Sequence, residues 1–271
     1  MLARLCTALN RFFPTPPHPS GRDSPTSYAT NQFQRAAQRY HQFLRSLVHF
    51  AGRDLLDVGC GYGGKTLFYA VKTGPHSVTG MDISDEVLWF ARRFAAQSAA
   101  SLRWVRGSVE CLPYADESFD IVIAEDVFEH VSDPDAGLQE CKRVLRAEGI
   151  LIVIIDPLYH SCYGSHLYDY IYVPWAHLIF PKSALISAVR EQSSVGPVLD
   201  PARAIALFCG LNQLTVVQFD RLVRNLDMRP VYTERRTSND WRARLPLIRL
   251  LFIEAVTYVL QKPTSTSEDA L

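Results

Sequence analysis

Glycines and carboxylates gather in the stretch DLLDVGCGYGG, which spans residues 54–64. The glycines that follow Asp57 are Gly59, Gly61, Gly63 and Gly64. Such a run lets the backbone turn tightly and approach a ligand, and a helix that begins there offers free N–H groups. Asp82 closes a second apolar run, SVTGMDI, where a carboxylate can hold two ribose hydroxyls. The pattern predicts a site for a cofactor that contains a ribose.

Short apolar runs alternate with helical segments along the chain, and these elements must position the two carboxylates. The expected strands are residues 54–59, 77–83, 102–107, 119–125 and 150–156, and the expected helices between them are 63–73, 84–98 and 134–147. After an insertion at residues 157–211, we expect a helix at 212–226 and closing strands at 230–237 and 254–262. The alternation predicts an α/β fold with a doubly wound, mostly parallel, seven-stranded sheet and a ligand site at the carboxyl ends of its strands.

Two cofactors with a ribose fit this pattern, and Asp57 separates them. A dinucleotide would place its pyrophosphate on the glycine loop, beside the negative charge of Asp57. S-adenosylmethionine instead carries an ammonium group and a sulfonium, which a carboxylate attracts, while backbone N–H groups receive its own carboxylate. The residues therefore favour S-adenosylmethionine, with an NAD(P)-dependent oxidoreductase as the weaker alternative.

Residues 54–156 resemble class I S-adenosylmethionine-dependent methyltransferases, in the branch that includes small-molecule and quinone methyltransferases. The matching segments are LLDVGCGYGG, GMDIS, LPYADESFDIVIAEDVFEHVSDP and RVLRAEGILIVIIDP. The resemblance implies that the glycine loop surrounds the amino-acid part of the cofactor, that Asp82 holds the ribose and that Ile83 packs on the adenine. Many relatives have an acid after the third strand, where this chain has Ser108. The cofactor-binding residues expected on this basis are Asp57, Gly59, Cys60, Gly61, Gly63, Asp82, Ile83, Ser108, Val109 and Glu125.

A group of ionisable residues, EDVFEHV, follows the expected fourth strand, where the transferred methyl group should point. Asp126, Glu129 and His130 are spaced so that a helical turn places them on one face. The segment resembles the E-x-x-E-H metal site of ubiquinone-biosynthesis O-methyltransferases and small-RNA 2′-O-methyltransferases, with Asp126 replacing the first glutamate and His160 as a fourth candidate ligand. We favour a metal-free site in which FEHV is a packing element and His130 is hydrogen-bonded near the cofactor. His130 as a general base without a metal, with Glu129 beside it, is an intermediate option, and a divalent cation on the three residues is the alternative.

The insertion at residues 157–211 is rich in aromatic residues and histidines. Its aromatic residues before position 182 are Tyr159, Tyr163, Tyr168, Tyr170, Tyr172, Trp175 and Phe180. We expect this segment to cover the acceptor pocket, because loops on a rigid sheet carry specificity and aromatic walls exclude water. The alternative is a small separate core that buries these rings. Among the histidines of the insertion, His166 is the leading candidate for a base.

Composition limits the class of protein. Basic and acidic residues balance at 28 each, and without a basic stripe no nucleic-acid partner is expected. Six scattered cysteines with no C-x-x-C pair predict reduced thiols and a cytoplasmic location. The apolar runs are all shorter than the roughly eighteen residues that a membrane span needs.

The two ends of the chain differ from its middle. Leu2, Leu5, Leu9 and Phe12 recur at helical spacing, which predicts a short helix that docks on its own domain, with a membrane contact as the alternative. The expected parts are an N-terminal helix with a Pro-rich linker at 1–27, a methyltransferase domain at 28–263 and a disordered tail at 264–271.

Together these patterns predict methyl transfer from S-adenosylmethionine to a small or medium, hydrophobic or aromatic organic acceptor, with O-methylation favoured. The transfer would be a direct in-line displacement, so the protein supplies position and a base. A non-catalytic protein that binds the cofactor is the main alternative, because a pocket does not prove turnover. An enzyme that acts on a lipid at a membrane surface is another. The sequence names neither the acceptor nor the oligomeric state.

Overall fold

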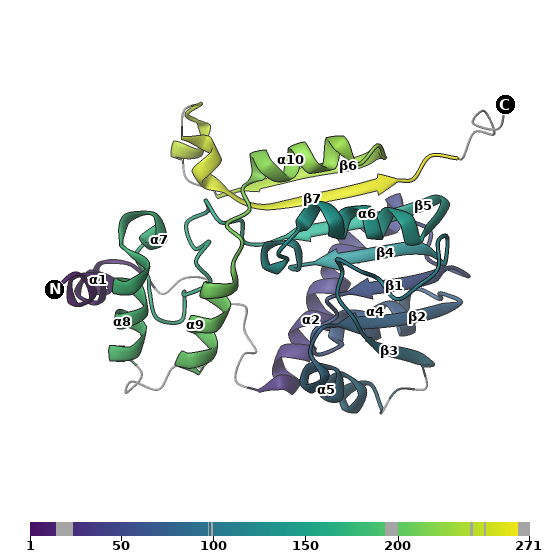
Figure 1. Ribbon diagram of the computed structural model, residues 1–271, viewed down its shortest axis with the longest axis horizontal. Coiled ribbons are helices and arrows are strands. Elements are labelled where there is room, and N and C mark those ends of the chain that lie inside the picture. The colour runs from purple at the N-terminus through teal and green to yellow at the C-terminus, as the bar shows by residue number, and fades with distance from the viewer. Residues whose placement is uncertain are drawn as a thin grey trace.

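A seven-stranded sheet in the order β3-β2-β1-β4-β5-β7-β6 forms the centre of the computed structural model (Figure 1). The structure describes residues 1–14, 24–96, 98, 100–192, 200–238, 241–246 and 248–264. The strands are β1 (Asp54–Val58), β2 (Ser77–Asp82), β3 (Leu102–Arg106), β4 (Phe119–Glu125), β5 (Leu145–Ile155), β6 (Arg229–Thr237) and β7 (Ile253–Gln261). The first five strands are parallel, and β7 runs antiparallel to β5 and β6. The predicted doubly wound α/β fold is confirmed.

Helices cover both faces of the sheet because the central strands bury both faces. Helices α2 (Pro25–Arg39) and α4 (Gly64–Lys72) pack with the side chains of one face, such as Ile121 and Ile123. Helices α6 (Pro134–Val144) and α10 (Val216–Asn225) pack with the other face. Apolar runs that are buried on both sides are typical of parallel strands, which is why the sequence pattern located them.

The helix starts follow capping chemistry. Ser84 precedes α5 (Asp85–Ala95), and its hydroxyl accepts a hydrogen bond from the Val87 amide at 3.3 Å. Asp133 does the same for α6, accepting from the Asp135 and Ala136 amides at 3.1 Å. A side-chain oxygen in this position satisfies a backbone donor that the helix leaves free.

Several elements differ in their bounds from the sequence-based expectation: α5 ends at Ala95 instead of residue 98, and α10 begins at Val216 instead of residue 212. Helix α6 ends at Val144, three residues before the expected end, and β5 begins at Leu145 because the Glu117 and Ser118 amides bond to the carbonyls of Arg143 and Val144. Helix α2 begins at Pro25 in a region expected to be linker. Residues 15–23 of that linker and 265–271 of the expected tail lie outside the described residues.

The insertion forms a small core of its own with the N-terminal helix. Its helices are α7 (Ala176–Ile179), α8 (Lys182–Gln192) and α9 (Pro201–Gly210), and α1 (Leu2–Leu9) packs against α8. Tyr170 and Phe180 are buried in this cluster together with Ala3 and Cys6 of α1. Within the described residues, no helix is long and apolar enough to cross a membrane. All six cysteines are free.

Candidate cofactor and acceptor site

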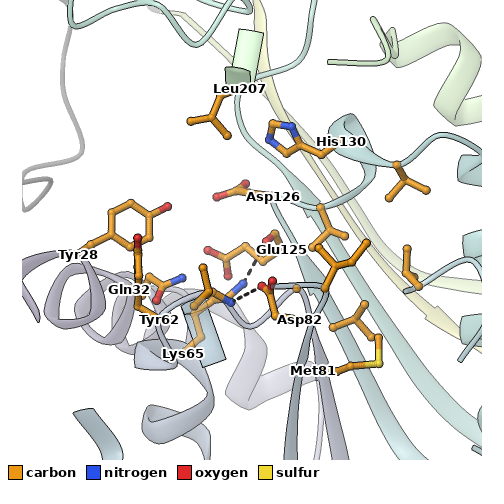
Figure 2. A pocket seen from close by; sticks show the side chains of 18 of the residues that line it. Tyr28, Gln32, Tyr62, Lys65, Met81, Asp82, Glu125, Asp126, His130 and Leu207 are labelled. Carbon is orange, nitrogen blue, oxygen red and sulfur yellow. Dashed lines mark hydrogen bonds between the residues drawn. The ribbon is translucent and has the colours of Figure 1, made fainter. Parts of the chain in front are cut away.

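A cavity of about 610 Å³ lies at the carboxyl ends of β1, β2, β3 and β4 (Figure 2). Its floor is the chain that follows these strands, and its walls come from α2 and α9. Figure 2 shows Asp82 on one side of the cavity, with Asp126 and His130 above it and Leu207 of α9 beyond them. The cavity therefore stands where a parallel sheet binds its ligands.

Seven of the ten residues predicted to bind the cofactor line this cavity. They are Gly59, Gly61, Asp82, Ile83, Ser108, Val109 and Glu125. The three that do not line it are Asp57, Cys60 and Gly63. Cys60 is fully buried, and at Gly63 an added Cβ would lie 2.7 Å from the Trp104 ring, so these two residues serve the packing of the loop.

The position of Asp57 differs from the sequence-based expectation. It lies inside β1, and its side chain is completely buried beneath the loop. The Thr66 hydroxyl donates to it at 2.6 Å, and the Lys65 ammonium lies 3.8 Å away. Burial raises the pKa of Asp57, and Lys65 opposes that shift. Within the described structure this carboxylate therefore holds the loop to α4 instead of facing the cavity.

Asp82 is presented to the cavity in a fixed orientation. One carboxylate oxygen accepts from the Gly61 amide and the other from the Ser84 amide, both at 3.0 Å. Each oxygen keeps a second lone pair for a ligand hydroxyl. Ile83 beside it is 68 % exposed, which leaves an apolar surface for a flat ring. The residues present thus fit the ribose and base of S-adenosylmethionine.

Many relatives have an acidic residue where this chain has Ser108, and in this chain a carboxylate, that of Glu110, follows two residues later. Glu110 lines the cavity, and its side chain accepts from the Asp133 amide at 2.7 Å. The Ser108 hydroxyl accepts from the Glu110 amide at 3.2 Å, which turns the chain so that both residues reach the cavity. The sequence analysis missed Glu110, although an acid two positions from Ser108 is visible in GSVECLPY.

Helix α2 packs unusually closely on the glycine loop. At Gly64 an added Cβ would lie 1.8 Å from the Ala29 carbonyl oxygen, and at Gly61 it would lie 2.8 Å from the Gln32 side chain. The Gly64 amide donates to Gln32 at 3.3 Å. The loop therefore needs glycine at Gly64 to admit the helix. Helix α2 in turn contributes Tyr28, Gln32 and Arg35 to the cavity wall.

Ion pairs join α2 to the end of β4. Arg39 forms an ion pair with Glu125, which is 4 % exposed, and the Lys65 ammonium donates to the Glu125 carbonyl at 3.0 Å. Burial opposes ionisation of Glu125, but Arg39 and Lys65 outweigh it and hold its pKa below the usual range. Arg35 lies 3.4 Å from Asp126. The network ties α2 to the cavity floor.

The structure brings the three predicted catalytic residues together. The imidazole rings of His130 and His166 lie 5.4 Å apart, and the His130 Nε2 atom is 4.0 Å from Glu129. Of the three residues, only His130 lines the cavity. Burial lowers the pKa of His130, so its ring is neutral and able to accept a proton at neutral pH. Burial, and then the nearby Asp126 carboxylate, raise the pKa of Glu129 well above its usual range.

The alternative of a metal site gains no support from the geometry. No group of three His, Cys, Asp or Glu side chains in the described ranges is arranged to hold an ion. Asp126 accepts from the Asp156 amide at 3.1 Å and faces Arg35, so both of its oxygens are already engaged. The positive φ of Asp126, 57°, turns its side chain toward these partners.

Helix α9 closes the side of the cavity opposite the sheet. It contributes Leu207 and Arg203, and Arg203 donates to the Tyr62 hydroxyl at 2.6 Å. The aromatic residues expected to form a lid do not line the cavity in the part of the insertion that the structure describes; Tyr170 and Phe180 are buried in the separate core. None of the seven expected aromatic residues lines the cavity, and for Tyr170 and Phe180 the reason is that their rings pack with α8 and α9.

Comparison with known proteins agrees with this geometry. Residues 56–153 match the family model described as "Methyltransferase domain". A curated protein of Dinoroseobacter shibae named "Ubiquinone biosynthesis O-methyltransferase" is 36 % identical over 125 residues, which is 46 % of this chain and 48 % of that protein. The chain thus spans about half the length of the curated relatives it matches.

Solved structures share the fold over most of the chain. One chain of the complex between the Haloferax volcanii Trm112 methyltransferase activator and a methyltransferase has a TM-score of 0.57 at 15 % identity, covering 92 % of this chain and 100 % of that one. The [4+2]-cyclase SpnF has a TM-score of 0.56 at 18 % identity, covering 85 % of this chain and 83 % of that one. The domain match over residues 56–153, together with the cavity at the carboxyl ends of the strands, identifies this part of the chain as a class I S-adenosylmethionine-dependent methyltransferase domain.

Proposed function

We propose that the chain transfers a methyl group from S-adenosylmethionine to a hydrophobic or aromatic hydroxyl compound of small or medium size. The observation that carries this proposal is a single cavity that joins Asp82 to His130. A carboxylate suited to a ribose stands on one side, and a neutral imidazole stands where an acceptor hydroxyl would enter. The name of the curated relatives, which are O-methyltransferases, favours oxygen as the acceptor atom.

Each part of the cavity has a task in such a transfer. S-adenosylmethionine supplies an electrophilic methyl group on its sulfonium. Asp82 orients the ribose, and the glycine loop leaves room for the amino-acid part. His130 accepts the proton of the acceptor hydroxyl, and Glu129 lies behind it, 4.0 Å from its Nε2 atom. The ion pairs of Arg35 and Arg39 hold α2 over the cavity and keep water out.

The acceptor side of the cavity favours an apolar ligand. Val127, Val131 and Leu207 line it near His130, and Tyr28 contributes a ring from α2. Apolar walls with a few polar groups are typical of sites for small molecules. A cytoplasmic location remains part of the proposal, supported by six free thiols.

Binding of S-adenosylmethionine without methyl transfer is the second candidate. It is favoured by one specific comparison, since SpnF shares the fold and is named a [4+2]-cyclase. To decide between them, the chain is incubated with methyl-labelled S-adenosylmethionine and phenols or catechols of increasing alkyl length. Methyl transfer is supported if labelled product appears in the organic phase with the wild type and does not appear with Asp82→Ala. Cofactor binding without labelled product across the series would favour the second candidate.

His130→Gln is expected to reduce kcat by about 100-fold or more, which is the usual contribution of a general base. The wild-type rate should fall in acid, below the ordinary histidine pKa of about 6.5, because burial lowers the pKa of His130. The variant should lose this acid limb while its KM for the cofactor stays unchanged. His76→Gln, a change at a histidine whose side chain is 75 % exposed, serves as the control. An acid limb that persists in His130→Gln would assign the base elsewhere.

A further inference from the structure

Helix α1 docks through Ala3, Cys6 and the partly buried Leu9, and leaves Leu2 and Leu5 exposed. Ala3 and Cys6 are buried, and Asn10 donates to the Tyr170 carbonyl at 2.6 Å just after the helix. On the opposite side, Leu5 is 49 % exposed and Phe12 is 67 % exposed. The sequence-based expectation was a helix whose apolar stripe faces its own domain. The helix does dock, but most of its stripe points away from the protein.

Two other segments carry exposed apolar side chains, namely α7 and the segment that precedes β7. In α7, Ile179 is 63 % exposed, and α7 leads directly into α8, on which α1 packs. Trp175, at the start of α7, donates to the Leu251 carbonyl at 3.1 Å, which ties the segment at 248–252 to α7. Figure 1 shows these segments at the end of the molecule away from the C-terminus of β7. The exposed apolar residues of this "apolar end" are Leu2, Leu5, Phe12, Phe13, Leu178, Ile179, Trp241, Leu245 and Leu250.

The charged residues within the three segments of the apolar end are all basic, while Glu191 of α8 and Glu254 of β7 lie outside these segments. The chain contains 28 acidic residues, yet none lies within residues 1–14, 175–182 or 241–252. The exposed charged residues there include Arg4 and Arg11, and the Arg11 guanidinium lies 4.8 Å from the centre of the Phe12 ring. A chain with no net charge therefore presents one end that is both apolar and basic. That combination matches the surface of an anionic membrane.

We propose that the apolar end binds the surface of anionic lipid membranes. Leu2, Leu5 and Phe12 enter the boundary between headgroups and acyl chains, and the arginines contact the lipid phosphates. The contact is peripheral, since no described helix is long enough to cross the bilayer. Helix α9 lines the cavity with Leu207 and packs in the same cluster as α1, so one small core supports both the membrane contact and the cavity wall. The inference stands independently of the proposed methyl transfer, because it rests on surface residues alone.

The test uses the full chain and vesicles of phosphatidylcholine, with and without phosphatidylglycerol. Co-sedimentation is expected with the anionic vesicles and should be much weaker with phosphatidylcholine alone. The combined variant Leu2→Ser, Leu5→Ser, Phe12→Ser should lose binding by at least on the order of tenfold, because it removes the buried apolar area. Arg4→Gln with Arg11→Gln should weaken binding by about fivefold for each charge removed.

A matched control tests whether exposed apolar residues elsewhere on the protein also contribute to vesicle binding. Val71, Val217 and Val231 are 41 %, 47 % and 37 % exposed and lie on the sheet domain, so their combined change to serine should leave vesicle binding intact. Thermal unfolding of each variant verifies that it is folded. Absence of wild-type binding to anionic vesicles overturns the proposal, and so does equal binding by the leucine and phenylalanine variant. Self-association that this variant abolishes, without vesicle binding by the wild type, would assign the surface to a second copy of the chain.

Discussion

Gly64→Ala is expected to destabilise the protein by about 3 kcal/mol and to weaken cofactor binding at the same time. The added Cβ would lie 1.8 Å from the backbone oxygen of Ala29 and 2.8 Å from the Gln32 Cβ, so α2 must move away from the loop. Movement of the helix carries Tyr28, Gln32 and Arg35 out of the cavity wall. Urea unfolding measures the free energy change, and titration with S-adenosylhomocysteine measures the loss of affinity.

Gly210→Ala is the matched control for this change. Gly210 ends α9, and an added Cβ there meets nothing within 4 Å, so its effect on stability should stay within about 0.5 kcal/mol. Equal stability of Gly64→Ala and the wild type would contradict the close packing of α2 on the loop. A stable Gly64→Ala variant with weakened cofactor binding would mean that α2 moves as an independent lid.

Arg39→Met is expected to destabilise the protein by about 3 kcal/mol at neutral pH, because it leaves the buried Glu125 carboxylate without its principal counterion. Lys65 stays close to Glu125 because its ammonium donates to the Glu125 backbone carbonyl. The loss of stability should therefore lie at the lower end of the range for breaking a buried ion pair. Restoring neutrality with Glu125→Gln in the same chain should recover part of the stability. Arg53→Met, at a pair whose arginine side chain is 53 % exposed, should cost less than about 1 kcal/mol.

The pH dependence of this variant has a definite sign. In the wild type the pKa of Glu125 is lowered, so its stabilising effect is present above the ordinary glutamate pKa of about 4.3 and is lost as pH falls further. In Arg39→Met, burial without Arg39 raises the pKa of Glu125. The stability difference between the two chains should therefore be largest at neutral pH and shrink in acid. A difference that is constant from neutral pH to about pH 3 would show that Glu125 is not the group affected.

The sheet and its ligand-binding edge could be predicted because the central strands are buried on both faces. Strands β1, β2 and β4 are short and mostly buried, with a few polar residues among their apolar ones, and β4 matches the expected bounds of 119–125. Capping residues also located helices, as Ser84 did for α5. Asp82 was found because an acid that ends the second strand has a defined place in this fold.

Tertiary contacts decided the features that the sequence did not reveal. Helix α2 has the sequence PTSYATNQFQRAAQR, and its buried residues are Ala29 and Ala36. It therefore lacks the stripe of large apolar residues that usually signals a helix in a sequence. Its N-terminal signals, Ser24 followed by Pro25, were present, and Arg35 and Arg39 stand four apart on one face. The burial of Asp57 was not predictable for a different reason. The sequence pattern places Asp57 in a strand before the glycine loop, but it does not tell whether the side chain faces the cavity or is buried beneath the loop.

The face of α1 that packs on the protein could not be predicted from its sequence pattern either. An apolar stripe at helical spacing predicts burial of that stripe, but of α1 the core of the insertion fully buries only Ala3 and Cys6, and Leu9 is only partly buried against it. The closeness of His130 and His166 depends on the path of the insertion, which has no periodic signal of its own. Both residues were named for their chemistry, and the fold places their rings 5.4 Å apart.

Thermal unfolding with S-adenosylhomocysteine tests most directly whether the cavity is a cofactor site built on Asp82. At one hundred times its dissociation constant, a ligand adds about 2.7 kcal/mol of stability, which should raise the wild-type midpoint by roughly 5–10 °C. We expect Asp82→Ala to lose this rise and Asp85→Ala, a change at an exposed residue in the first turn of α5 that does not line the cavity, to retain it. NADH should give no rise in any of the three chains. A rise with NADH alone, or no rise with S-adenosylhomocysteine at saturation, would contradict the assignment of this cavity to S-adenosylmethionine.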